Sequence, residues 1–164
     1  MSEITDQFQR YRQAGILVDT NILLLFFIGA FDQSLIPRFK RTRQFTVEDY
    51  TTLISILGLF DKIVTTPHIL TEVSNLSGQL GEPVRSEYFK KFSSGIILLE
   101  EENVAGRDVA QMQEFVRFGL TDSGIIRVTR GRYLVLTDDF RLSQYLQGAG
   151  VDVVNFNHIR VTNW

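Results

Sequence analysis

The sequence predicts an α/β fold, in which a parallel, doubly wound sheet of about five strands lies between two layers of helices. Short, almost entirely apolar runs alternate along the chain with longer segments of helical periodicity. Strands that are apolar at every residue are buried on both faces, which is typical of parallel sheets covered by helices. A chain of 164 residues suits one such three-layer α/β/α sandwich, so we expect a single domain over residues 1–164.

Capping residues and apolar spacing set the elements of the first half. The apolar run that ends at Val18 is closed at once by Asp19, which makes it a strand rather than a helix. Thr46 is a suitable N-cap, and Thr66 followed by Pro67 is a strong helix-start signal, because the first helical turn leaves its N–H groups unpaired. The expected elements are strands at residues 16–18 and 63–65, helices at 22–31, 47–60 and 67–80, and a loop insertion at about 32–46.

The second half continues the alternation of strands and helices. Gly81 is expected to end one helix and Pro83 to open the next. An acidic segment at residues 100–102 is expected to form a turn after an apolar strand. The expected strands lie at residues 96–99, 133–136 and 151–156, with helices from 83, near 109–118, from 120 to 130, and from about 140 to 148.

Composition excludes several classes of protein. The absence of cysteine excludes disulfides, thiolate metal sites and cysteine nucleophiles, and 2 histidines are too few for a multi-histidine zinc site. The 13 phenylalanines and 44% hydrophobic residues are typical of a folded core. No apolar run is long enough to span a bilayer, so we expect a cytoplasmic protein with no membrane partner. With a net charge of -2, the chain can attract nucleic acid only through a local basic patch.

Carboxylates gather where the strands are expected to end. Asp19 follows the first strand, and Asp138 and Asp139 follow the fourth. Glu72 lies in the helix after the second strand, and Asp122 opens the helix before the fourth. Ligands of open parallel sheets bind beyond the carboxyl ends of the strands. Because oxygen donors without cysteine or histidine suit hard cations, we expect Mg²⁺ or Mn²⁺ at these acids.

Each of these acids also has a structural explanation. Asp122, Asp138 and Asp139 follow threonines that can cap helices, where acids complement the helix dipole, and we favour capping for Asp138. Glu72 flanks an apolar stripe and Asp19 lies between two apolar runs, where a carboxylate without a partner is costly. A functional role is therefore indicated most strongly for these two residues.

The acids occur in motifs that resemble a known family. The segment Val18-Asp19-Thr20-Asn21-Ile22-Leu23 is similar to the opening motif of the PIN-domain family, which are metal-dependent nucleases with a doubly wound α/β/α fold. Glu72 and Asp122 match further family acids in order, and Asp139 matches the family's threonine-any-aspartate pattern in Thr137-Asp138-Asp139. The resemblance extends over residues 15–156. Arg127 and Arg130, together with the longer loop after the first helix, depart from the compact toxin members.

The resemblance implies an endoribonuclease that hydrolyses RNA phosphodiester bonds with Mg²⁺ or Mn²⁺. It implies catalytic and metal-binding roles for Asp19, Glu72, Asp122 and Asp139, and supporting roles for Thr20, Asn21, Thr137 and Asp138. It also raises the possibility of a toxin of the VapC type, neutralised by a small antitoxin protein, or of an RNA-processing enzyme. Homodimers are common in the family, so a second copy of the chain is a further expected partner.

A basic segment lies in the expected loop insertion. Four positive side chains there provide phosphate contacts for RNA, namely Arg38, Lys40, Arg41 and Arg43. Phe39 and Phe45 flank them and are positioned in the sequence for base stacking. The alternative is a solvated loop that two buried phenylalanines anchor.

Two functions compete with the nuclease. A phosphatase of the haloacid-dehalogenase class also has an aspartate after its first strand, but it needs a second aspartate two residues later, where this chain has Asn21. A non-catalytic PIN-like scaffold that binds RNA or protein is the other alternative. It is disfavoured because an idle cluster of carboxylates lowers stability.

Overall fold

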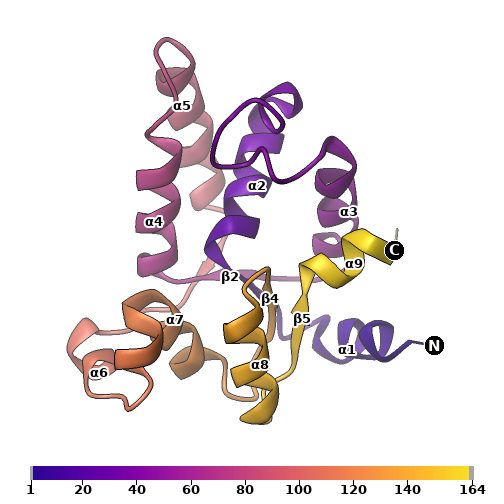
Figure 1. Cartoon of the computed structure of the whole chain (residues 1–164), viewed down its shortest axis with the longest axis vertical. Coiled ribbons are helices and arrows are strands. Elements are labelled where there is room, and N and C mark those ends of the chain that lie inside the picture. Colours follow the sequence, from indigo (N-terminus) through magenta and orange to yellow (C-terminus); the bar gives the residue numbers. More distant parts are fainter. Residues whose placement is uncertain (1, 163–164) are drawn as a thin grey trace.

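A five-stranded, all-parallel sheet lies at the centre of the computed structural model, which describes residues 2–162 (Figure 1). The strands are β1 (Ile16–Val18), β2 (Ile63–Thr65), β3 (Glu100–Glu101), β4 (Leu134–Thr137) and β5 (Val153–Asn155). Each neighbouring pair is parallel, in the order β3-β2-β1-β4-β5. The predicted α/β class with a parallel sheet of five strands is therefore confirmed.

Helices flank this sheet on both sides. Figure 1 shows those that connect β1 to β3 above the strands and those that connect β3 to β5 below them, as in a three-layer α/β/α arrangement. The upper group is α2 (Thr20–Phe31), α3 (Val47–Leu57), α4 (Pro67–Ser77) and α5 (Val84–Ile96), and the lower group is α6 (Gly106–Ala110), α7 (Phe115–Thr129) and α8 (Phe140–Gly148). The first and last helices are α1 (Glu3–Tyr11) and α9 (Phe156–Thr162), and the 3-10 turn η1 (Gln33–Leu35) lies in the loop after α2.

The strand order creates a switch point between β1 and β4. From β1 the chain adds β2 and β3 on one side, and it then returns to add β4 and β5 on the other. The connections therefore diverge to opposite faces at β1 and β4, which leaves a crevice beyond the carboxyl ends of these two strands.

Helix α2 is the most buried helix because it is apolar on almost every side. Leu23, Leu24 and Ile28 are fully buried, since α2 packs against α3, α4 and α5 as well as against the sheet. Gly29 permits one of these contacts, because a Cβ there would lie 2.2 Å from the Tyr50 ring of α3. Truncation of a leucine in this helix to alanine should cost about 2–5 kcal/mol.

Two of the predicted helix starts of the first half are confirmed, whereas α2 begins at Thr20 rather than at residue 22. Thr46 caps α3 in a capping box with Asp49, in which each side chain accepts a hydrogen bond from the other's backbone N–H. Thr66 caps α4, with Pro67 in its first turn. These local contacts fix where both helices begin, and so where the preceding connections end.

Several elements differ from the sequence prediction. Helix α4 ends at Ser77, with Gly78 rather than Gly81 following it, and the helix predicted near residues 109–118 is divided between α6 and the start of α7. Helix α9 was not predicted. The predicted strand at residues 96–99 is wrong, because α5 continues through Ile96 and the edge strand consists of Glu100 and Glu101. Ile97 and Leu98 are 81% and 84% exposed in the turn between them. The helix α1 was not predicted; the Ser2 side chain caps it, and Phe8 is its one buried residue.

None of the helices in residues 2–162 combines the length and the hydropathy that a bilayer crossing requires.

Candidate active site

The register of the sheet brings Asp19 and the acid pair after β4 to one edge. Val18 pairs with Leu136, so Asp19 and the residues after Thr137 leave the sheet side by side. The Asp19 backbone N–H donates to the carbonyl of Leu136 at 2.9 Å. Asp19 therefore lies at the switch point, beyond the carboxyl ends of β1 and β4.

Asp19 is buried, and both of its carboxylate oxygens accept hydrogen bonds. The Thr20 backbone N–H donates to Oδ1 at 2.7 Å, and the Thr137 hydroxyl donates to Oδ2 at 2.6 Å. Burial, together with the charges of Asp138 and Asp139, raises the pKa of Asp19 to about 6, against the effect of these two hydrogen bonds. The site therefore holds a carboxylate whose charge is only partly compensated.

Glu72 is held between the starts of two helices. The Thr20 hydroxyl donates to its Oε2 at 3.0 Å, and the Thr121 hydroxyl donates to its Oε1 at 2.6 Å. Thr20 thus bonds to Asp19 through its backbone and to Glu72 through its side chain. The sequence predicted Thr121 as a helix cap, and the structure shows instead that it fixes Glu72.

Asp122 reaches the site because α7 breaks just before it. Gly119 has a φ of 77° and a ψ of -171°, so a new helical segment begins after it, with Asp122 near its start. Burial, together with the charges of Asp19, Asp139 and Glu72, raises the pKa of Asp122 to about 7. Among residues 2–162, no hydrogen bond or ion pair to the Asp122 carboxylate is present, and the nearby Arg141 only partly offsets the repulsion.

The acid pair after β4 divides its roles differently from the prediction. Asp139 is the N-cap of α8, since its Oδ1 accepts from the Leu142 N–H at 3.1 Å. The expectation that Asp138 caps this helix is therefore wrong. Asp138 accepts instead from the Asn21 side chain at 3.3 Å, and burial raises its pKa. Both residues directly follow β4 at the edge of the sheet. Asp139 has the extended backbone conformation that is typical of an N-cap, with φ -84° and ψ 112°.

The donor chemistry of these acids fits a hard divalent cation, although they are not gathered into a ready cage. Oxygen is the donor in every case, and unfavourable charge interactions link Asp19, Asp122 and Asp139. In the part of the chain that the structure describes, no three acid or histidine side chains converge closely enough to hold a metal ion. Threonine groups donate one hydrogen bond to each oxygen of Asp19 and Glu72, which leaves a second lone pair on each oxygen for a cation. Because the acids do not yet surround one point, binding requires the side chains to move toward one another.

The basic loop is exposed, but its phenylalanines are not. Phe39 and Phe45 are 7% and 2% exposed and belong to the core, so the expectation that they stack on bases is wrong. Lys40 and Arg43 make no hydrogen bond or ion pair within residues 2–162. Arg38 donates to Ser34, and Arg41 donates to Gln79.

His68 also lies in this region, although it is not one of the predicted site residues. It lines a pocket of about 450 Å³ together with Glu72, Thr121 and Asp122. Its Nδ1 atom is buried beside Gly124 and has no hydrogen-bond partner among residues 2–162. Its spacing of one helical turn before Glu72 was the signal that placed both side chains on the same face of α4.

The structure thus brings the predicted acids and their supporting residues to one edge of the sheet. Thr20, Asn21 and Thr137 each bond to one of these acids. At the end of the basic loop, the Gln44 carbonyl accepts from Arg160 of α9, and Asn157 of the same helix bonds to the Asp138 carbonyl. The sequence matches no protein-family model and no curated protein.

Proposed function

We propose that the protein is an endoribonuclease of the PIN-domain type that uses Mg²⁺ or Mn²⁺. The observation that supports this proposal is that Asp19 lies at the switch point of the sheet and that Asp122 is near enough for the two charges to repel. Both have a raised pKa, of about 6 and about 7, in a crevice where ligands of such sheets bind. Burial and mutual repulsion make the charged forms of these carboxylates unfavourable, so they do not stabilise the fold. A cation site explains their position better.

The acids have separable roles in this proposal. Asp19 and Asp122 would hold the cation, with the Asp139 oxygen that does not cap α8 as a further donor. A bound divalent cation supplies charge stabilisation on the scissile phosphate and lowers the pKa of a water that attacks it. Glu72, fixed by two threonines, would accept a proton from that water. Thr137 keeps Asp19 oriented, and Asn21 does the same for Asp138.

RNA is the proposed substrate because the loop after α2 concentrates positive side chains that can bind phosphates. The chain has a net charge of -2, but Arg38, Lys40, Arg41 and Arg43 are exposed on one loop whose end contacts α9. That loop would bind the phosphate backbone while the acids act on one bond. A toxin neutralised by a small antitoxin, and a homodimer, belong to the same proposal.

The test is cleavage of a labelled pool of mixed RNA by the purified protein. Reactions contain Mn²⁺, Mg²⁺ or a chelator, and they compare the wild type with Asp19→Asn. Asp108→Asn is the matched control, because Asp108 lies on α6 and, within the described part of the chain, pairs only with the exposed Arg107. We expect cutting by the wild type and by Asp108→Asn with either cation, and none by Asp19→Asn or with the chelator.

Two results would contradict the proposal. Cutting that persists in Asp19→Asn would come from a contaminant or from another site. Phosphate release from small phosphoesters, with all RNA left intact, would favour the phosphatase alternative. If the wild type cuts, expression in cells separates the biological roles, since a toxin arrests growth and its Asp19→Asn variant does not.

A further inference from the structure

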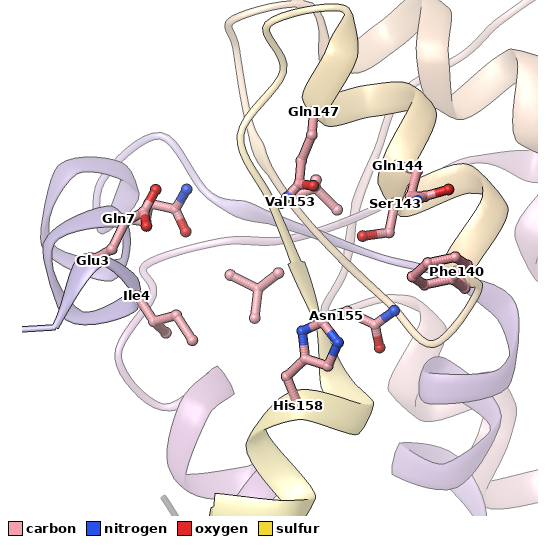
Figure 2. A pocket seen from close by; sticks show the side chains of 11 residues that line it. Glu3, Ile4, Gln7, Phe140, Ser143, Gln144, Gln147, Val153, Asn155 and His158 are labelled. Carbon is pink, nitrogen blue, oxygen red and sulfur yellow. The ribbon is translucent and has the colours of Figure 1, made fainter.

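A second pocket lies beside β5, between α1 and α8. Its volume is about 260 Å³. Figure 2 shows Ser143 and Gln144 of α8 on one side of it, Gln7 of α1 on the other, and Asn155 at the end of β5. It contains none of the acids described above, so it is separate from the proposed cation site.

This pocket opens next to that site. Asn155 pairs with Thr137 in the sheet register, so it lies at the carboxyl edge where Asp19 and Asp138 emerge. Phe140, which lines the pocket, directly follows Asp139. A strand of RNA with one phosphate at the acids would therefore have a neighbouring nucleotide within reach of the pocket.

Two largely buried side chains in the pocket each have one polar atom without a partner among residues 2–162. Ser143 and Asn155 are each 5% exposed. The Asn155 carbonyl accepts from the backbone N–H of Asn157, but its amide nitrogen donates to no residue in the range 2–162, and the Ser143 hydroxyl has no partner there either. Neither of these unpaired atoms is sealed off from the pocket, so both are available to a polar ligand that enters it.

The other lining residues define the chemistry of that ligand. Phe140 is 60% exposed, which leaves one face of its ring free for stacking. Gln144 and Gln147 present amides that make no hydrogen bond to the described residues. No lysine or arginine lines the pocket, and Glu3 does, which disfavours a phosphate. Amides that both donate and accept, next to a free aromatic face, fit a neutral, planar, hydrogen-bonding ring.

We propose that this pocket binds one unpaired nucleobase of the substrate, stacked on Phe140 and hydrogen-bonded by Ser143 and Asn155. The proposal rests on the proposed function for the identity of the ligand as RNA. The pocket adds a property that the acids alone would not confer. It makes cleavage occur at a fixed distance from a preferred base. A good side-chain pair to a base edge discriminates against the wrong base by about 1–3 kcal/mol, or fivefold or more.

The first test does not depend on cleavage. Adenosine, guanosine, cytidine and uridine are each titrated at millimolar concentration into the ¹⁵N-labelled protein, and the side-chain amide signals are followed by NMR. We expect one or two of the nucleosides to shift the signals of Asn155 and Gln144, and we expect Asn155→Asp to abolish the shift. That variant keeps the oxygen that accepts from the Asn157 N–H but removes the donor.

Matched variants separate a binding role from a folding role. Asn75→Asp makes the same change at an exposed position of α4, and it should bind the nucleoside as the wild type does. Ser143→Ala removes the other buried group by a smaller change and should weaken binding at least fivefold. If none of the four nucleosides shifts these signals in a folded protein, the pocket does not bind a base and the proposal is wrong.

The second test sequences the fragments from the RNA pool. We expect one base to be enriched at one position relative to the cut, and we expect Phe140→Leu to lower that enrichment fivefold or more. Cleavage without a preferred base at any position would overturn the pocket while leaving the nuclease in place. Binding of a nucleoside by a protein that cuts no RNA would keep the pocket and contradict the nuclease.

Discussion

At the scale of single residues, one hydroxyl connects the two central strands at the candidate site. The Thr137 hydroxyl donates to Asp19 at 2.6 Å and accepts from the Asp139 N–H at 3.0 Å. Thr137→Val keeps the shape but removes both hydrogen bonds. We expect the free energy of unfolding at pH 8 to fall by about 1–3 kcal/mol, because a buried carboxylate loses a donor. We also expect the pKa of Asp19 to rise above its value of about 6.

Urea unfolding measures the first effect and titration by NMR the second. Thr137→Ser is the control, since it retains the hydroxyl, and it should stay close to the wild type. Equal stability of the valine and serine variants would mean that the hydrogen bond to Asp19 contributes nothing.

The positions of the acids were predictable from the sequence, but the directions of their side chains were not. Asp19 was predicted from the abrupt end of an apolar strand, and it does lie at that strand's carboxyl end. The sequence could not show that Asp139 rather than Asp138 caps α8, because the choice between them depends on the backbone φ and ψ angles after β4. Nor could it show that Phe39 and Phe45 point into the core, because residues far along the chain provide their contacts.

At the scale of elements, the break in α7 is what places Asp122. Gly119 has φ 77° and ψ -171°, a region that is essentially restricted to glycine. Gly119→Ala should therefore cost about 1–3 kcal/mol of unfolding free energy and displace the segment that carries Thr121 and Asp122. We expect a corresponding loss of RNA cleavage.

Gly148→Ala provides the control for this variant. An added Cβ has no neighbour within 4 Å at either glycine, but the φ of Gly148 is not positive. The two variants therefore differ in backbone strain and not in space. Urea unfolding of Gly148→Ala should change by less than that of Gly119→Ala, and the reverse order would exclude strain as the cause.

The loop after α2 has its own testable role. Lys40 and Arg43 are exposed and unpaired among the described residues, so their replacement by glutamine should leave the stability unchanged. For single-stranded RNA, each phosphate contact contributes about 0.7 to the slope of log affinity against log salt. We expect the double variant to reduce this slope by about 1.4, as measured by fluorescence anisotropy in a chelating buffer.

Charges elsewhere provide the comparison for the loop. Lys90 and Arg107 are also exposed, and each pairs with an acid on its own helix. Their replacement by glutamine should leave the salt slope unchanged. An equal reduction in both double variants would mean that RNA responds to net charge rather than to the loop.

Elements with strong local signals were predictable, and those set by tertiary contacts were not. The strands β1 and β2 match the prediction residue for residue, because each is a short apolar run next to a capping residue. The prediction of the third strand was wrong, since Ile96 is the last residue of α5 and residues 97–99 form the turn after it. An edge strand with one neighbour can be short and polar, so β3 has no apolar signal in the sequence.

At the scale of the whole molecule, strand order decides which acids meet. The amino-acid sequence predicted parallel strands but not the order in which they lie in the sheet. Only an order that places β1 next to β4 brings Asp19 beside Asp138 and Asp139, which lie more than a hundred residues away along the chain. The site is therefore a property of topology, and its charge repulsion acts on the stability of the whole fold.

This repulsion makes stability depend on pH in a definite direction. In the folded protein the pKa values of Asp19 and Asp122 are about 6 and about 7, above the ordinary value of 3.8. The folded state therefore binds these protons more tightly than the unfolded state does. The stability that they provide is fully present below about pH 4 and is lost as the pH rises to about 7. Each unit of pKa shift corresponds to about 1.4 kcal/mol, so the loss amounts to a few kcal/mol.

Asp122→Asn isolates this effect, because the Asp122 carboxylate has no hydrogen bond to lose within the described residues. In a chelating buffer at pH 8, we expect the variant to unfold at higher urea concentration than the wild type, and the difference to vanish near pH 4. Mn²⁺ should raise the melting temperature of the wild type, because a ligand of the folded state stabilises it, and should raise that of Asp122→Asn less. Asp108→Asn should behave as the wild type in both respects. A variant that gains no stability at pH 8, together with a wild type that does not respond to Mn²⁺, would mean that these acids neither repel one another nor bind a cation.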